Sequence, residues 1–144
     1  MYPSKIRKAI EKYLEDRPDE VAFLRSEFDG CGNSRSGVDK TLRSMVEEGK
    51  FLRVGYGAYA KSSKRVSVIT GNIVVATDAL TETCAAQLLR KLGVDPRQDS
   101  ATREYNEGKS TQVPAWLAFD VGKARISRRI SFGERQLYYE RSTR

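Results

Sequence analysis

Apolar residues near the N-terminus recur at the spacing of a helix with one buried face. From Ile6 onward they stand at positions i, i+3, i+4, i+7 and i+8, which predicts an amphipathic helix that begins after Pro3-Ser4. Pro18 disfavours helical geometry in the residue before it, so this helix should end by Arg17. A second, short helix is expected from Asp19, with these buried candidates: Val21, Phe23, Leu24 and Phe28.

A third predicted helix has the most basic outer face of this half. It follows a glycine-containing turn at residues 29–33, Ser34 is a good N-cap, and Gly49 stands where a C-cap glycine belongs. Its apolar positions again share one face: Val38, Leu42, Met45 and Val46. The exposed positions of its first turns are Arg35, Ser36, Asp39, Lys40 and Arg43.

A small β-hairpin is expected next. Residues 51–54 and 58–61 are typical of strands, and Gly55-Tyr56-Gly57 makes a tight turn between them. Three helices followed by a hairpin is the order of a winged helix-turn-helix, in which the third helix enters the major groove of duplex DNA. Residues 1–62 are therefore predicted to form a DNA-binding domain. The predicted DNA-contact residues, two of which lie just beyond this domain, are Asn33, Ser34, Arg35, Ser36, Lys40, Arg43, Arg53, Tyr56, Lys61, Lys64 and Arg65. The alternative is a helix face that is merely solvated.

The second half, residues 66–144, is predicted to be a small α+β domain behind a short linker at Ser62-Ser63. Residues 66–75 are apolar and β-branched, with a turn expected at residues 70–72. Asp78 is the predicted N-cap of a helix that ends at Gly93 and carries Leu80, Cys84, Leu88 and Leu92 on one face. The whole chain is therefore expected to belong to the α+β class.

Three antiparallel strands are expected near the C-terminus, at residues 116–119, 124–131 and 136–141, with turns at 121–122 and 132–134. In the middle strand, alternation places Ile126 and Ile130 on the same face as Arg128. Arg125, Ser127 and Arg129 share the other face.

Charge is distributed unevenly along the 144 residues, whose net charge is +7. Residues 33–65 carry eight Lys and Arg against three Asp and Glu, and residues 121–144 carry seven against two. The two other stretches are close to neutral or acidic. Basic blocks confined to part of a chain are typical of a phosphate-binding surface. The alternative is a protein that is basic in general.

The sequence offers little for catalysis or metal binding. It has no histidine and two cysteines, Cys31 and Cys84, that stand far apart, so a zinc site, a disulfide framework and a histidine-based triad are not expected. We expect no enzyme activity, no catalytic residue, no metal and no cofactor. No apolar run reaches the length of a membrane span and no signal peptide is recognised, which predicts a cytoplasmic protein with no membrane partner.

Several motifs resemble those of known families. The run SRSGVDKTLRSMVEEGKFLRVGYGAYAKS resembles the winged-helix antitoxin and transcriptional-regulator superfamily. Together with YNEGKSTQVP, RISRRISFG and YYER, it resembles the AbiEi-type antitoxins of type IV toxin–antitoxin systems and their short relatives over nearly the whole chain. The resemblance implies a bacterial autorepressor that binds repeats in its own promoter. It also implies a C-terminal domain that counters a nucleotidyltransferase-like toxin.

Two segments of the second half are candidates for partner or DNA binding. Gly108-Lys109-Ser110 resembles the end of a phosphate-binding loop, but Arg103 occupies the position of its first glycine, so a P-loop is rejected. The polar loop at residues 106–112 could contact a ligand or stabilise the sheet through hydrogen bonds of its own. The basic strand could extend the DNA footprint, dock an acidic partner or keep an exposed strand soluble. The candidate residues are Asn106, Lys109, Ser110, Thr111, Gln112, Arg125, Arg128, Arg129 and Arg135.

Three classes of function remain open from the sequence. The leading interpretation is a sequence-specific double-stranded DNA-binding regulator, an antitoxin-like autorepressor. The second is a protein-interaction module that counters a toxin or another partner without reading DNA sequence. The third is a metal-dependent nuclease built on Asp120, Lys123 and Glu104 or Glu107, and it has the weakest signal.

Overall fold

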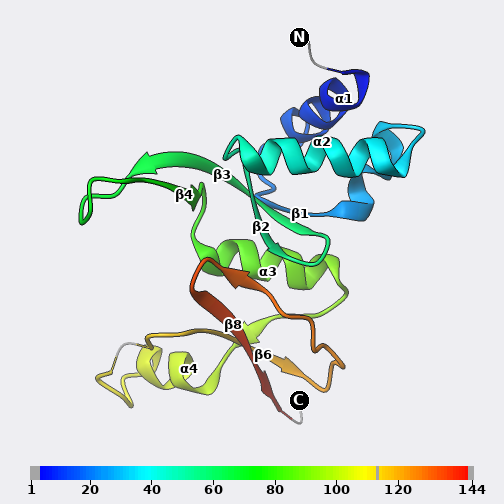
Figure 1. The fold of residues 1–144 in the computed structure, drawn as a ribbon. Coiled ribbons are helices and arrows are strands. Elements are labelled where there is room, and N and C mark those ends of the chain that lie inside the picture. Colours follow the sequence, from blue (N-terminus) through cyan, green and yellow to red (C-terminus); the bar gives the residue numbers. More distant parts are fainter. Residues whose placement is uncertain (1–3, 113, 143–144) are drawn as a thin grey trace.

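The computed structural model describes residues 4–112 and 114–142 and has an α+β fold, as the sequence predicts (Figure 1). Pro3 and Val113, which belong to predicted motifs, lie outside the described residues. The first half contains α1 (Lys5–Glu15), β1 (Ala22–Leu24), the 3₁₀ helix η1 (Arg25–Cys31), α2 (Arg35–Glu47), β2 (Phe51–Gly55) and β3 (Ala58–Val66). The second half contains β4 (Ile73–Thr77), α3 (Thr81–Lys91), β5 (Arg97–Gln98), α4 (Ser100–Asn106), β6 (Leu117–Gly122), β7 (Ser131–Phe132) and β8 (Arg135–Arg141).

Two helices of the first half begin at the caps that the sequence predicts. The side chain of Ser4 accepts a hydrogen bond from the backbone N–H of Arg7, and Ser34 accepts one from Gly37 at 3.2 Å. Each bond satisfies an N–H group that has no partner inside its helix. The predicted second helix is wrong, because residues 22–24 form a strand and only the residues after them form a 3₁₀ helix.

The strand β1 forms because both of its faces are buried. The side chains of Ala22 and Phe23 are both fully buried, and they belong to different core clusters. β1 pairs antiparallel with β3, which pairs with β2 on its other side. Such a doubly buried strand lacks the alternation that identifies a half-exposed strand, and its partner stands more than thirty residues away.

The expected linker at Ser62-Ser63 is wrong. Both residues lie inside β3, which continues beyond the first sheet and pairs with β4. The turn between β3 and β4 includes residues 70–72, as predicted. Asp78 does not cap α3, because the N-cap position is Leu80, and the Asp78 carboxylate instead accepts a hydrogen bond from Ser63 Oγ at 2.7 Å.

The C-terminal sheet differs from the predicted meander. Its strand order is β5-β6-β8-β7, and β6 and β8 are parallel neighbours. The predicted turn at 121–122 lies at the end of β6, and residues 124–130 form an extended segment that belongs to no strand. That segment still alternates, since Ile126 and Ile130 are buried while Arg125 and Arg129 are exposed.

Two clusters form the core, and one of them joins the two halves. The aromatic cluster lies between α1, η1, α2 and the sheet, and consists of Ile10, Phe23, Phe28, Val38, Leu42, Met45 and Phe51. The shared cluster combines Ala22, Val54, Ala58 and Ala60 of the first sheet with α3 residues such as Leu88 and Leu89 and with residues of the C-terminal sheet. The expected domain boundary at residues 62–66 therefore falls within β3, and the shared cluster contains residues from both sides of this boundary.

Polar contacts strengthen the same junction. Lys91 at the end of α3 places its Nζ 2.5 Å from the Glu20 carboxylate, 2.9 Å from Glu27 and 2.8 Å from the carbonyl oxygen of Ala22. The side chain of Gln87 accepts a hydrogen bond from the N–H of Val21. These contacts hold α3 against β1, beneath the first sheet in Figure 1.

The two cysteines are expected to differ in reactivity. Burial raises the pKa of the Cys84 thiol to about 11, so about one molecule in a thousand carries the reactive thiolate at pH 8. Cys31 is only half-buried, and burial raises its pKa too. A thiol reagent at pH 8 should label Cys31 first and Cys84 only on unfolding. Rapid labelling of the native Cys31→Ser variant would contradict this.

Candidate nucleic-acid interface

The outer face of α2 carries a row of exposed cationic side chains. Arg35, Lys40 and Arg43 are all exposed, and the buried face of the same helix belongs to the aromatic cluster. At the N-terminus of the helix, Ser34 Oγ lies 2.9 Å from Ser36 Oγ, and both serines and Asn33 are exposed. The predicted residues of this segment are therefore all accessible, but they face two sides of the helix. Arg35 and Arg43 line a hollow toward the β2–β3 turn, whereas Lys40 lines a hollow toward α1.

Asp39 is the one acidic residue among the predicted outer positions in the first turns of α2, and Arg25 of η1 pairs with it. Arg25 of η1 places its Nε 2.5 Å from Asp39 and its Nη1 2.5 Å from Asp29. Its hydrogen bond with Asp39 is the largest of the effects that raise the pKa of Arg25, so the guanidinium stays charged. Asp39 consequently adds little negative charge to the face. The role of Arg25 was not predicted, because the carboxylates it pairs with lie on different helices.

The turn between β2 and β3 lies beside this helix face. Arg25, Arg35, Asp39, Arg43, Val46, Arg53, Tyr56, Gly57 and Tyr59 line a hollow of about 320 Å³ between α2 and the turn. At the turn Tyr56 is 78% exposed, and Arg53 is held near it by a 3.4 Å hydrogen bond from its Nε to the carbonyl oxygen of Gly55. Helix and turn thus form one continuous surface.

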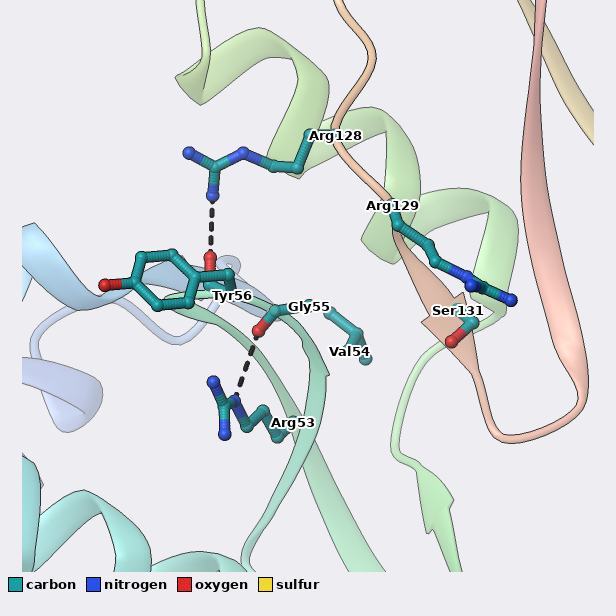
Figure 2. Close-up of a pocket in the computed structure, with 7 residues that line it drawn as sticks. All are labelled: Arg53, Val54, Gly55, Tyr56, Arg128, Arg129 and Ser131. Carbon is teal, nitrogen blue, oxygen red and sulfur yellow. Dashed lines mark hydrogen bonds between the residues drawn. The ribbon is translucent and has the colours of Figure 1, made fainter.

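The extended segment before β7 packs against the other side of the turn (Figure 2). Arg128 Nη1 donates a 2.8 Å hydrogen bond to the carbonyl oxygen of Tyr56, as Figure 2 shows. A Cβ placed on Gly55 would lie 2.7 Å from the carbonyl oxygen of Arg129, so glycine is what permits this close approach. Arg53, Arg128 and Arg129 line an open hollow of about 600 Å³ there.

Most arginines of this surface share one electrostatic property. Among the residues that the structure describes, five of them have no carboxylate within 4 Å, whereas Arg25 is paired with Asp29 and Asp39 and arginines elsewhere, such as Arg7 and Arg97, are ion-paired too. An unpaired guanidinium is free to bind an oxyanion in the bidentate way that suits carboxylates and phosphates. The five are Arg35, Arg43, Arg53, Arg128 and Arg129, while the predicted Arg125 is exposed but lines neither hollow.

Three predicted contact residues lie away from the helix and the turn. Lys61 is half-buried, with its Nζ 3.4 Å from the carbonyl oxygen of Arg17 and 5.5 Å from the centre of the Phe23 ring. Lys64 and Arg65 lie near the far end of β3 from the turn, and Arg65 is 3.7 Å from the Asp78 carboxylate. The structure therefore does not bring these three together with Tyr56.

The candidate loop of the second half lies in a different region. Asn106 ends α4, and the exposed loop after it contains Lys109, which pairs with Glu107 at 3.1 Å. Ser110 Oγ accepts a hydrogen bond from the backbone N–H of Gln112, and Thr111 is exposed. In Figure 1 α4 lies on the opposite side of α3 from α2. Arg135 pairs with Glu82 and Thr81 of α3.

No group of three or more His, Cys, Asp and Glu side chains in residues 4–112 and 114–142 could hold a metal ion. Within the same residues, no helix combines the length and apolar character needed to cross a membrane.

No family model matches the sequence, and searches of curated proteins and of solved structures found no match.

The turn is expected to depend on its glycine at position 57. Gly57 has a φ of +64°, as its predicted place in a tight turn requires, and a Cβ there would meet only Arg25 Cβ at 3.6 Å. The cost of a side chain is thus backbone strain, and Gly57→Val should lower the free energy of unfolding by ~1–2 kcal/mol. Gly30 has open space and no positive φ. Thermal unfolding of Gly30→Val is the control, and equal losses in both variants would refute the strain argument.

Proposed function

We propose that this chain binds double-stranded DNA through a winged helix-turn-helix, with α2 as the recognition helix and the β2–β3 turn as the wing. The observation that carries the proposal is the set of exposed cationic side chains along α2 and the adjoining turn, which form no ion pair within residues 4–112 and 114–142. The element order α1-β1-η1-α2-β2-β3 and the sheet order β1-β3-β2 support it, because winged helices have this arrangement.

The chemistry of the surface favours DNA over a protein partner. In the part of the chain that the structure describes, the guanidinium and ammonium groups of Arg35, Lys40 and Arg43 form no ion pair. Contact with phosphates and with guanine edges requires such available cations. Among the aromatic side chains beside it, Tyr56 is the exposed one at the tip of the turn. A protein-docking surface would be expected to offer a larger apolar centre.

The C-terminal arginines extend the same proposed interface. Arg128 is bonded to the turn, and Arg129 lines the hollow on the side of the turn that faces away from α2. Of the three interpretations of the basic segment, an extension of the DNA footprint agrees best with this position.

Arg129→Ala should lower the salt dependence of binding by about one phosphate contact. Arg103→Ala on α4 is the matched control and should leave it unchanged.

The test is a titration of the full chain with labelled duplex DNA at several salt concentrations. If phosphates are bound, the logarithm of the binding constant falls linearly with the logarithm of salt concentration. Selection of bound duplexes from a random pool then shows whether a sequence is preferred. Binding that is absent at low salt, or that does not change with salt, would favour the protein-interaction alternative. Cleavage of DNA with magnesium or manganese would favour the nuclease.

The autorepressor and antitoxin roles are part of this proposal and rest on the family resemblance. The chain should protect repeats upstream of its own reading frame from nuclease digestion. A co-transcribed reading frame for a nucleotidyltransferase-like protein, whose toxicity is relieved by this chain, would support the antitoxin role. Relief that persists in a variant unable to bind DNA would place the two activities on separate surfaces.

A further inference from the structure

The outer part of the β3–β4 hairpin projects from the body of the molecule as an uncharged apolar arm (Figure 1). On β3 the uncharged stretch begins after Lys64 and Arg65, which stand opposite Val75 and Val74 of β4. The arm, residues 66–77, contains no Asp, Glu, Lys or Arg in a chain that is 31% charged. At its tip Val68 and Ile69 are 101% and 90% exposed. Its other exposed apolar side chains are Val66, Ile73, Val74 and Val75. Contiguous apolar surface of this kind on a soluble protein marks an interaction site.

One edge of the arm is open for strand pairing. Within the described residues β4 pairs only with β3. The carbonyl oxygen of Asn72 accepts a hydrogen bond from the N–H of Ser67, and the N–H of Asp78 donates one to the carbonyl oxygen of Lys61. Backbone groups alternate in direction along a strand, so those of the even-numbered residues face β3 and those of the odd-numbered residues, Val75 among them, point away from it. Natural edge strands are usually protected by charge, proline or a bulge. Residues 73–77 contain no charge and no proline and form no bulge with β3. This indicates that a partner covers the edge of β4 in the functional state of the protein.

The position of the arm argues against DNA as the covering partner. The proposed wing precedes β3, at Tyr56, and the arm continues from its other end after a strand of nine residues. Nine extended residues span roughly 30 Å. The tip of the arm therefore lies far from the wing, and the arm itself offers no cation for a phosphate.

We propose that the arm is a dimerisation element, in which β4 pairs antiparallel with β4 of a second copy about a two-fold axis. Two copies of a chain with a net charge of +7 repel each other wherever their basic surfaces meet. Over residues 66–77 they can approach without directly opposing like charges, because Lys64 and Arg65 belong to β3 and lie one strand away from the paired edge. An isologous contact also places the same open edge on both partners, so each satisfies the other's outward N–H and C=O groups.

The size of the arm sets the strength of the contact. A stable interface involves roughly 20–30 residues on each partner, and the arm supplies 12. A dimer held by the arm is therefore expected to be in equilibrium with the monomer in the micromolar range.

Sedimentation velocity of the full chain from about 1 to about 200 µM tests the proposal. The wild-type chain should shift from monomer to dimer across this range. With the axis at Val75, Val75→Lys and Val75→Glu each place like charges across it. Val75→Lys should weaken the dimer at least ~10-fold, and Val75→Glu should weaken it less, because Lys64 stands opposite Val75 in β3 and offsets part of the new charge. An equimolar mixture of the two variants should restore it, because opposite charges then face each other.

The controls separate self-pairing from the other possible occupants. Thr70→Lys puts the same charge at the tip but beyond β4, and should still dimerise. A wild-type chain that stays monomeric throughout, or a mixture that fails to restore the dimer, overturns the proposal. Monomeric chain that co-sediments with vesicles of phosphatidylcholine and phosphatidylglycerol would instead assign the arm to a lipid surface. The experiment contains no DNA, so its result is independent of the proposed function.

Discussion

Replacing Arg35, Lys40 and Arg43 together with alanine is expected to reduce DNA affinity at least ~100-fold while leaving the fold intact. A base-specific contact contributes about 1–3 kcal/mol, and each phosphate contact also contributes to the salt dependence. Loss of even two such contacts accounts for a change of this size. The triple variant should therefore bind more weakly and with a shallower dependence on salt.

Stability should not change much, because none of the three side chains is part of a core cluster or an ion pair within the described residues. Alanine also has the highest helix propensity. The melting curve of the variant should match that of the wild-type chain, so a loss of affinity cannot be attributed to unfolding.

Removal of charge by itself needs a control. Lys5, Lys8 and Lys12 are exposed on α1, and replacing them with alanine removes the same three charges from a different surface. This variant should lose far less affinity than the α2 variant. If the two triple variants bind DNA equally well, or if the α2 variant binds like the wild type, α2 is not the recognition helix.

Local signals made α1, α2 and the β2–β3 hairpin predictable from the sequence. Ser4 and Ser34 are caps whose hydrogen bonds involve residues three positions away, and Gly57 takes the positive φ that a tight turn needs. Each of these features depends on a few consecutive residues. The row of basic residues on α2 was predictable for the same reason, because helical periodicity alone determines which positions share a face.

Features that depend on partners far along the chain were not predictable. β1 was interpreted as helix because its burial on both faces results from pairing with β3 and from the packing of α3. The parallel pairing of β6 with β8 leaves no local signature that distinguishes it from a meander. Likewise, the sequence left the role of the basic segment open, and only its contact with the turn, through Arg128, relates it to the α2 surface.

The clearest consequence of long-range packing concerns the separation of the two halves. A separate DNA-binding domain, as predicted from the sequence, implies that residues 1–65 alone retain DNA binding, though more weakly than the full chain. The structure leads to a different expectation, because α3 covers the face of the first sheet that the aromatic cluster does not. Without it Val54 becomes exposed, and so do Leu24 and Leu52, which pack against the shared cluster.

Fragment 1–65 is therefore expected to lose cooperative unfolding and most of its DNA affinity. Exposing this apolar face costs several kcal/mol at about 25 cal/mol per Å², which is comparable to the whole stability of a small domain. The contacts of Lys91 with Glu20, Glu27 and the Ala22 carbonyl are lost as well. Circular dichroism during heating should show a broad, shallow transition for the fragment and a sharp one for the full chain.

A point substitution in the full chain tests the same interface without truncation. Leu88 is fully buried in the shared cluster, so Leu88→Ala should lower the free energy of unfolding by ~2–5 kcal/mol. Gln136→Ala on β8, a half-exposed position outside both clusters, serves as the control and should change it by less than about 0.5 kcal/mol. A fragment that melts sharply and binds DNA like the full chain would show that the first half is stable without α3, and that the shared cluster is an interface between two independent domains.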